Sequence, residues 1–321
     1  MLNNVFNLLQ LLLVGRVVVM QEEGLSKCRN WQEYNETLVK RGEMYLTFDF
    51  LENWDKDLEK LNRDKLGRKY AYPWSFIELL MLIHVIFRLP YRQLEGFVRK
   101  LSEFVPKIKA TDYTNIWRRG TKLELSLSDT IISSTEPVVI AIDSTGIKVT
   151  NRGEWMREKW RVYRGWIKVH LAVDVKTKQI VAIEVTDERV SDGSKFNSLI
   201  DQAEANVSGR KIDEVLGDGA FDRKEIFDHL HEKGIQPIIK TRSNANTKAR
   251  GSPARAKAVR ELKDLGYQCW KQKYDYGRRW TTESTFSAVK RISGEYVTAT
   301  KAENMIQEVI LKFTFYNMLI S

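Results

Sequence analysis

The chain has 321 residues, enough for about two domains, and 43% of them are hydrophobic, so the composition excludes a disordered protein. Lys and Arg number 52 against 42 Asp and Glu, and the net charge of +10 favours a polyanionic partner, nucleic acid or an acidic membrane surface. Two cysteines and four scattered histidines exclude a disulfide framework and a zinc cluster, and they favour a reducing cytosol.

Residues 1–20 are apolar, but Gln10 and Arg16 interrupt the run before it reaches the ~20 residues that a membrane span requires. A signal peptide carries its positive charge ahead of the apolar stretch, whereas Arg16 follows it. We therefore expect an apolar amino-terminal extension, or residues upstream of a start at Met20, on a cytoplasmic protein with no membrane part.

Residues 21–135 are predicted to be helical, because apolar and charged residues recur there at helical spacing and strong strand patterns are absent. Two helices flank Pro90, and a third follows Pro106 and carries the basic residues Arg118, Arg119 and Lys122. This arrangement predicts a helix-turn-helix that reads DNA. Any three-helix bundle shows the same spacing, so the pattern alone leaves the two interpretations open.

From Glu136 onward the pattern changes to three β-branched runs, PVVIAIDSTGIKV, GWIKVHLAVDV and KQIVAIEVTDERV. A helix, a short strand, a helix, a strand, a basic stretch and two further helices are predicted after them. This order predicts an α/β fold over 136–321, an RNase H-like mixed sheet flanked by helices, preceded by the all-α helix-turn-helix-like domain.

Two aspartates stand at the ends of apolar strands. Asp143 follows VVIAI, and Asp218 follows a short strand and lies between Gly217 and Gly219. Each could simply cap a turn. An unpaired carboxylate at the end of a buried strand is costly, however, so two of them on one sheet indicate a site that holds a cation.

A third signal lies in YDYGRRWTTESTFSAVK. At ~100° per residue, Arg279, Glu283 and Lys290 fall within about 40° of one another on a helix, and Tyr276 lies about 20° outside that arc. The alternative is a surface face with an Arg279–Glu283 ion pair worth a few tenths of a kcal/mol. Together with the two strand-end aspartates, the face favours a catalytic interpretation.

The basic excess is concentrated near the carboxyl end: fourteen Lys and Arg but only four Asp and Glu lie between Lys240 and Arg291. Within it, the stretch 241–275 resembles a flexible or lightly packed arm, and we expect it to grip DNA phosphates through Lys248, Arg250, Arg255 and Lys257. The alternative is a solvated surface loop. A second basic cluster, interleaved with tryptophans between Lys148 and Lys168, is either a packed hairpin or a DNA-contacting one.

The spacing Y-x2-R-x3-E-x6-K and the segments AIDSTGIKVTNRGEW, VHLAVDVKT and DGAFD resemble the insertion-sequence-five group of DDE transposases. The resemblance extends from Trp31 to Asn317. It implies an RNase H-like catalytic domain in which Asp143, Asp218 and Glu283 bind the metal, and in which Tyr276, Arg279 and Lys290 contact DNA. The basic insertion 241–275 is expected to replace the β-rich insertion of that group.

The resemblance also implies partners and a cofactor: terminal inverted repeats, target DNA, a homodimer on DNA at the nucleoid, and two Mg²⁺ ions for which Mn²⁺ can substitute. The chemistry agrees, because in-line displacement at phosphorus uses two divalent ions held by carboxylates and requires no histidine or cysteine. The alternatives are a domesticated transposase that acts as a DNA-binding regulator, and an RNase H-like nuclease of repair or recombination. The first would lack a triad carboxylate, and the second would lack the amino-terminal helices.

Overall fold

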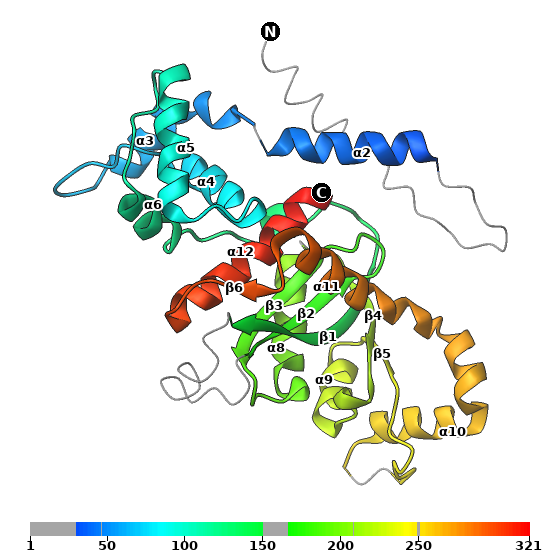
Figure 1. Cartoon of the computed structure of the whole chain (residues 1–321). Helices are drawn as coiled ribbons and strands as arrows, with labels where there is room; N and C mark the ends of the chain where they lie inside the picture. Colours follow the sequence, from blue (N-terminus) through cyan, green and yellow to red (C-terminus); the bar gives the residue numbers. More distant parts are fainter. Residues whose placement is uncertain (1–29, 46, 150–165, 208, 249–250) are drawn as a thin grey trace.

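The computed structural model describes residues 30–45, 47–149, 166–207, 209–248 and 251–321 (Figure 1). The predicted extension at 1–20, Arg250 and most of the predicted basic and aromatic hairpin lie outside these residues. The amino-terminal part is helical, as predicted, with two 3-10 turns, η1 (Asp49–Leu51) and η2 (Ser128–Thr130), and the helices α2 (Trp31–Met44), α3 (Trp54–Asn62), α4 (Trp74–Ile86), α5 (Tyr91–Phe104) and α6 (Tyr113–Gly120).

Helix α4 is the centre of this helical part. Its sequence WSFIELLMLIHVI is apolar nearly all round, and eight of its residues are buried. Trp54 of α3, Leu94 of α5 and Ile116 of α6 pack against it, and Leu311 and Phe315 from the last helix complete the same core. The helical part is therefore packed directly on the carboxyl-terminal part of the chain.

The remainder is a six-stranded mixed sheet with helices on both faces. The strand order is β3-β2-β1-β4-β5, where β1 runs antiparallel to β2 and parallel to β4, and the short β6 pairs with β1. This is the predicted RNase H-like order. The strands are β1 (Val138–Val149), β2 (Trp166–Asp174), β3 (Ile180–Asp187), β4 (Ile212–Gly217), β5 (Gln236–Ile239) and β6 (Tyr296–Val297).

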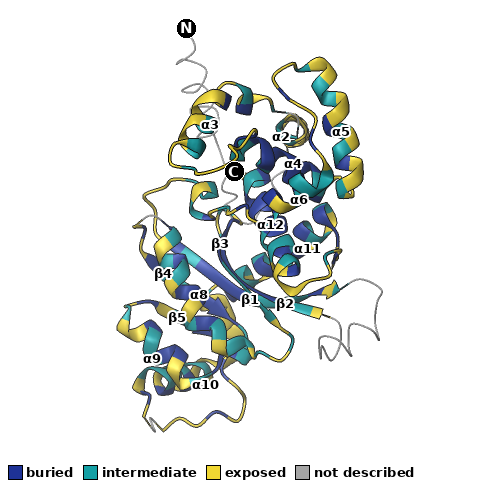
Figure 2. Cartoon of the chain, turned by 90° about the vertical axis from the view of Figure 1, so that its left-hand side faces the viewer, coloured by how far each residue is buried: buried dark blue, intermediate teal, exposed yellow. Residues whose placement is uncertain are grey.

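Alternation along β1 divides the core between the two faces of the sheet. Ile140 and Ile142 pack toward α8 (Asp192–Asn206) and α9 (Lys224–Glu232). On the other face, Ile147 packs with residues of α11 (Trp280–Ser293) and α12 (Ala302–Ile320). Figure 2 shows the buried residues concentrated in the sheet and in α4. Asp143 belongs to the α11 face of β1, and this placement determines the site.

The stretch 241–275 differs from its prediction as a lightly packed arm. Most of it forms helix α10 (Pro253–Lys273), which bends where Gly266 has a φ of 71°. Ser252 caps the helix by accepting a hydrogen bond from the Arg255 amide, Pro253 occupies the first turn, and Trp270 is buried. Ser followed by Pro is a helix-start signal, and Ala, Arg and Lys are strong helix formers, so local chemistry favours the helix.

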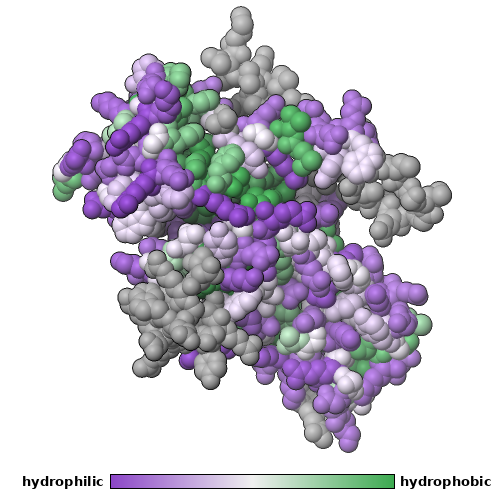
Figure 3. All heavy atoms as spheres, viewed as in Figure 1, coloured by the Kyte–Doolittle hydropathy of each residue, from purple (hydrophilic) through white to green (hydrophobic). Residues whose placement is uncertain are grey.

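The surface is largely hydrophilic over the sheet and its helices, whereas apolar surface gathers between α2 and the other amino-terminal helices (Figure 3). Within the described ranges, no helix combines the length and apolar character needed to span a membrane.

Candidate active site

Asp143 and Glu283 face the same groove on the α11 side of the sheet. Asp143 lies in the middle of β1, which continues to Val149, so the prediction that it ends its strand is wrong: the polar run after it still pairs with β2. Glu283 lies in the first turn of α11, which packs across that strand. The groove has a volume of about 640 Å³. Its lining is mostly polar and charged, and consists of Asp143, Ser144, Thr145, Glu283, Phe286, Ser287, Lys290, Arg291 and Glu295.

Arg279 joins the two carboxylates. It ends the short 3-10 turn η4 (Tyr276–Arg279) and precedes α11. Its NH1 contacts Oδ2 of Asp143 at 3.0 Å and its NH2 contacts Oε1 of Glu283 at 2.9 Å. The other oxygen of Asp143 accepts a hydrogen bond from the Ser144 amide at 2.8 Å. The predicted proximity of these residues is therefore present, with the arginine placed between the two acids.

The electrostatics of Asp143 reflect this crowding. Burial raises the pKa of Asp143, and the charges of Asp218 and Glu283 raise it further, while the Ser144 amide and Arg279 act in the opposite direction. Burial alone would lower the pKa of Arg279, but the surrounding carboxylates outweigh it and raise that pKa. Asp143 and Glu283 thus share one arginine.

Asp218 stands next to Asp143 at the same edge of the sheet. The parallel register pairs Ala141 of β1 with Leu216 of β4. Asp143 comes two residues after Ala141 and Asp218 two residues after Leu216, so the two aspartates lie at the same level of the sheet. Asp218 caps the 3-10 turn η3 (Gly219–Phe221) by accepting a hydrogen bond from the Ala220 amide at 2.8 Å. It does not line the groove, which is bordered by Asp143 and Glu283.

The donor chemistry suits a divalent cation, because Mg²⁺ prefers carboxylate oxygens. In the part of the chain that the structure describes, no group of three or more Asp, Glu, His or Cys side chains converges closely enough to hold a metal ion. Between Asp143 and Glu283 the Arg279 guanidinium occupies the intervening position. The triad residues therefore fit the ion in kind, and they require a rearrangement to hold it together.

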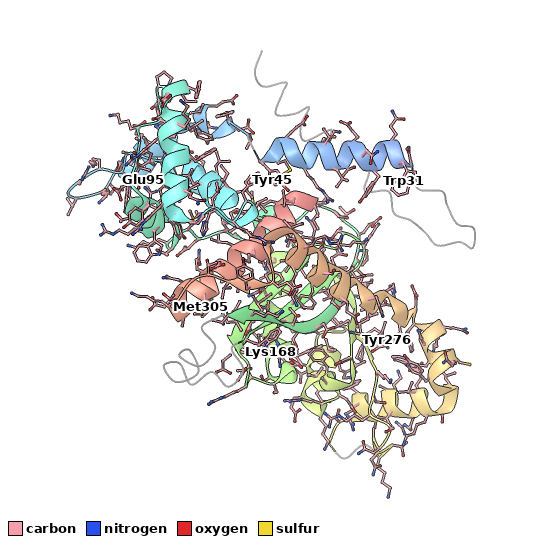
Figure 4. The ribbon with its side chains drawn as sticks, viewed as in Figure 1. Trp31, Tyr45, Glu95, Lys168, Tyr276 and Met305 are labelled. Carbon is pink, nitrogen blue, oxygen red and sulfur yellow. The ribbon has the colours of Figure 1, made fainter. Side chains whose placement is uncertain are left out.

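Tyr276 is placed inside the protein. Its side chain is buried, lies between α10 and the sheet (Figure 4), and packs on Trp270 at 5.0 Å between ring centres. Its hydroxyl donates to the carbonyl oxygen of Gly217 at 2.9 Å, and burial raises its pKa to about 12. The predicted DNA contact does not match this placement: Tyr276 lies on η4, outside α11, so the helical-wheel angle does not apply to it.

Lys290 faces the groove as predicted and donates to Oγ1 of Thr145 at 2.8 Å; burial lowers its pKa. Ser287 and Arg291, also in the groove, were missed by the sequence analysis. They follow Glu283 by four and eight residues on α11, and that spacing is the signal that could have identified them.

Arg118 and Arg119 have opposite surroundings. Arg118 is exposed, as a DNA contact requires. Arg119 is only 6% exposed; its guanidinium lies 4.0 Å from the ring centre of Trp74 and 4.5 Å from that of Tyr70, and it donates to the Tyr72 carbonyl. The prediction that Arg119 contacts DNA is therefore wrong for this conformation, because the guanidinium is used inside the helical core.

The predicted phosphate-binding residues of 241–275 also differ from one another in exposure. Lys248 and Lys257 are exposed. Arg255 instead forms a two-pronged ion pair with Asp222, whose side chain is fully buried, through contacts of 2.6 and 2.9 Å. A buried carboxylate requires such a partner. Arg255 thus has a structural role that its place in a basic run could not reveal.

A six-stranded mixed sheet of this order, with Asp143 within β1, Asp218 directly after β4 and Glu283 on α11, is that of an RNase H-like domain. A family model described as a transposase DDE domain matches residues 134–318, more than half of the chain, and a second model of the same description matches 39–152. The chain belongs to the transposase DDE domain family.

Solved structures give more distant similarities. The piggyBac transposase in a synaptic complex with hairpin DNA is 11% identical, with a TM-score of 0.38, and the match covers 88% of this chain and 74% of that one. The Drosophila P element transposase in a strand transfer complex is 10% identical, with a TM-score of 0.34 and coverages of 88% and 70%. The insertion-sequence-five group remains a prediction.

Proposed function

We propose that the chain is a transposase that binds the ends of an insertion sequence and carries out metal-dependent DNA strand cleavage and strand transfer. The observation that carries the proposal is the meeting of Asp143 and Glu283 in one polar groove, with Asp218 beside them at the same edge of the sheet. The chain's family supports the same activity.

In this proposal Asp143, Asp218 and Glu283 hold Mg²⁺, with two ions expected and Mn²⁺ able to replace them. A divalent ion supplies activation of the attacking oxygen and stabilisation of the charge that develops at phosphorus. Lys290 and Arg291 lie along the same groove and would hold the phosphates of the reacting strand. Water is the expected nucleophile for nicking, and the freed 3′-hydroxyl attacks the target.

The DNA partners are the terminal inverted repeats and the target duplex. Arg118 on α6 is the proposed contact for terminal DNA, and the exposed Lys248 and Lys257 are proposed to hold phosphates without reading sequence. A homodimer would bring two ends together on the nucleoid.

The test uses the full-length protein with labelled duplexes taken from the two flanks of its own coding region, in Mg²⁺. The proposal predicts nicking at the ends and joining into a second duplex, both lost in Asp143→Asn, Asp218→Asn and Glu283→Gln while DNA binding persists. Specific binding without any cleavage would instead favour a DNA-binding regulator. Cleavage that ignores the end sequence and never joins strands would favour a nuclease.

A further inference from the structure

Arg279 occupies an unusual position for a residue expected to contact DNA. Its two terminal nitrogens contact carboxylates from two different elements, Asp143 of β1 and Glu283 of α11, at 3.0 and 2.9 Å. The Arg279 side chain is only 18% exposed, and the Asp143 side chain 22%. A pair this sheltered is screened less by water and salt than a surface ion pair.

The arginine and a divalent cation would compete for the same two carboxylates. A cation held by both acids would need Oδ2 of Asp143 or Oε1 of Glu283, or the oxygen beside each, within about 2.1 Å. The guanidinium already pairs with that Oδ2 and that Oε1, and its positive charge would repel the incoming ion at such short range. The two cations therefore exclude one another.

The acids also explain why a counterion is favourable there. Asp143 and Glu283 both contact one guanidinium, and the parallel register of β1 and β4 places Asp218 beside Asp143. Without a counterion these carboxylates would repel one another across β1 and α11. Arg279 relieves this repulsion when no metal is bound, and it keeps α11 attached to β1.

Arg279 is also able to leave. Glu283, its second partner, is 41% exposed and borders the open groove, so the side of the guanidinium that faces Glu283 is next to solvent and not inside the apolar core. Its backbone lies at the junction of η4 and α11, and its long side chain can turn without moving either element.

We propose that Arg279 is an internal counterion that holds Asp143 and Glu283 in register and is displaced when a divalent cation binds them. The inference rests on the proposed function, because it assumes that these carboxylates form the cation site. It makes Arg279 a positioning residue in the metal-free protein, and it leaves the guanidinium free for DNA phosphate only after the exchange. The cost of displacing Arg279 lowers the affinity of the site for the cation.

The test is calorimetric titration of the full-length protein with Mn²⁺ and with Mg²⁺, beside thermal unfolding in EDTA and in Mn²⁺. Arg279→Gln should bind Mn²⁺ about tenfold more tightly than the wild type, since no internal cation has to be displaced. It should unfold at a lower temperature in EDTA and gain more from Mn²⁺ than the wild type does.

Arg278→Gln is the matched control. Arg278 lies on the same turn and pairs with Glu214 at 2.7 Å and with Asp275 at 3.3 Å, and none of the three lines the groove. Its loss therefore removes one charge and two ion pairs, as the loss of Arg279 does, without freeing Asp143. It should bind Mn²⁺ as the wild type does. If Arg279→Gln does not fold in EDTA, Arg279→Met, which keeps a long side chain but carries no charge, should show the same direction of change.

Equal or weaker Mn²⁺ binding by the Arg279 variants would overturn the inference, and so would a complete lack of cation binding in both variant and wild type. Asp143→Asn separates this failure from that of the proposed function. Should Asp143→Asn bind the cation as well as the wild type does, the cation site itself is wrong. Should it lose binding while the Arg279 variants match the wild type, only the role of Arg279 is wrong.

Discussion

The hydroxyl group of Tyr276 donates a hydrogen bond to the carbonyl oxygen of Gly217, the last residue of β4, at 2.9 Å. Asp218 follows directly. Three residues beyond Tyr276, Arg279 contacts Asp143 of β1. The four-residue turn η4 therefore contacts both the strand that carries Asp143 and the strand that precedes Asp218, and it leads directly into the helix that carries Glu283.

Replacing Tyr276 by Phe removes the hydroxyl while keeping the ring against Trp270. We expect a loss of about 1 kcal/mol in the free energy of unfolding, or up to about 3 if the Gly217 carbonyl finds no other partner. Urea unfolding measures this loss. Tyr274→Phe is the control, because its hydroxyl donates to the side chain of Glu261 near the surface. If the two variants lose the same free energy of unfolding, the hydrogen bond from Tyr276 to Gly217 is no more important for stability than a surface one.

The raised pKa of Asp143 predicts that the free energy of unfolding depends on pH. Its folded-state pKa is raised above the ordinary 3.8, so the folded protein binds the proton more tightly than the unfolded chain does. The contribution of this group to stability therefore falls as the pH rises through the raised pKa, and the ionised form destabilises the fold above it. Asp143→Asn should unfold at a higher temperature than the wild type at pH 7 in EDTA, and the difference should shrink on acidification.

The control for this comparison is Asp213→Asn, whose carboxylate lies on β4 and pairs with the exposed Lys211. It should not raise the unfolding temperature. A wild-type protein that is as stable as Asp143→Asn at pH 7 would contradict the expected cost of the buried charge.

Substitutions of Arg118 and Arg119 should have different effects, the first on DNA binding and the second on the free energy of unfolding. Arg119→Gln removes a guanidinium packed on two aromatic rings, and we expect a loss of about 1–3 kcal/mol in the free energy of unfolding. Arg118→Gln should leave stability within about 0.5 kcal/mol of the wild type and weaken binding to terminal DNA. Circular dichroism and a DNA-binding titration test both. A stable Arg119→Gln protein with weakened DNA binding would reverse the assignment.

Salt dependence tests the basic segment. Each phosphate neutralised contributes about 0.9 to the slope of log K against log salt, so changing the exposed Lys248 and Lys257 to Gln should flatten the slope by up to about 2. Arg255→Gln should chiefly destabilise the protein, by about 3–5 kcal/mol, since it leaves the buried Asp222 unpaired. An unchanged slope in the double lysine variant would mean that these side chains do not meet DNA.

The sequence predicted what local patterns determine and missed what tertiary contacts determine. Asp218 directly follows the apolar strand β4, as predicted, whereas β1 continues to Val149 and Asp143 lies within it. The parallel register of β1 and β4 still places the two aspartates side by side. The burial of Arg119 could not be predicted, because α6 has only eight residues and its two adjacent arginines differ by one helical step. The helix at Pro253 was missed for another reason: its start signals were present, and its glycine, serine and charge were interpreted as a loop.

The most direct test concerns Asp218, since it belongs to the proposed triad but does not border the groove of Asp143 and Glu283. We propose single-turnover cleavage of the flanking-end duplexes in Mg²⁺ by Asp218→Asn, with Asp213→Asn on the same strand as the control. If the three acids form one catalytic centre, Asp218→Asn should lose at least about 10²-fold in cleavage rate while the control keeps its activity. Cleavage by Asp218→Asn within about threefold of the wild-type rate would contradict a three-carboxylate centre.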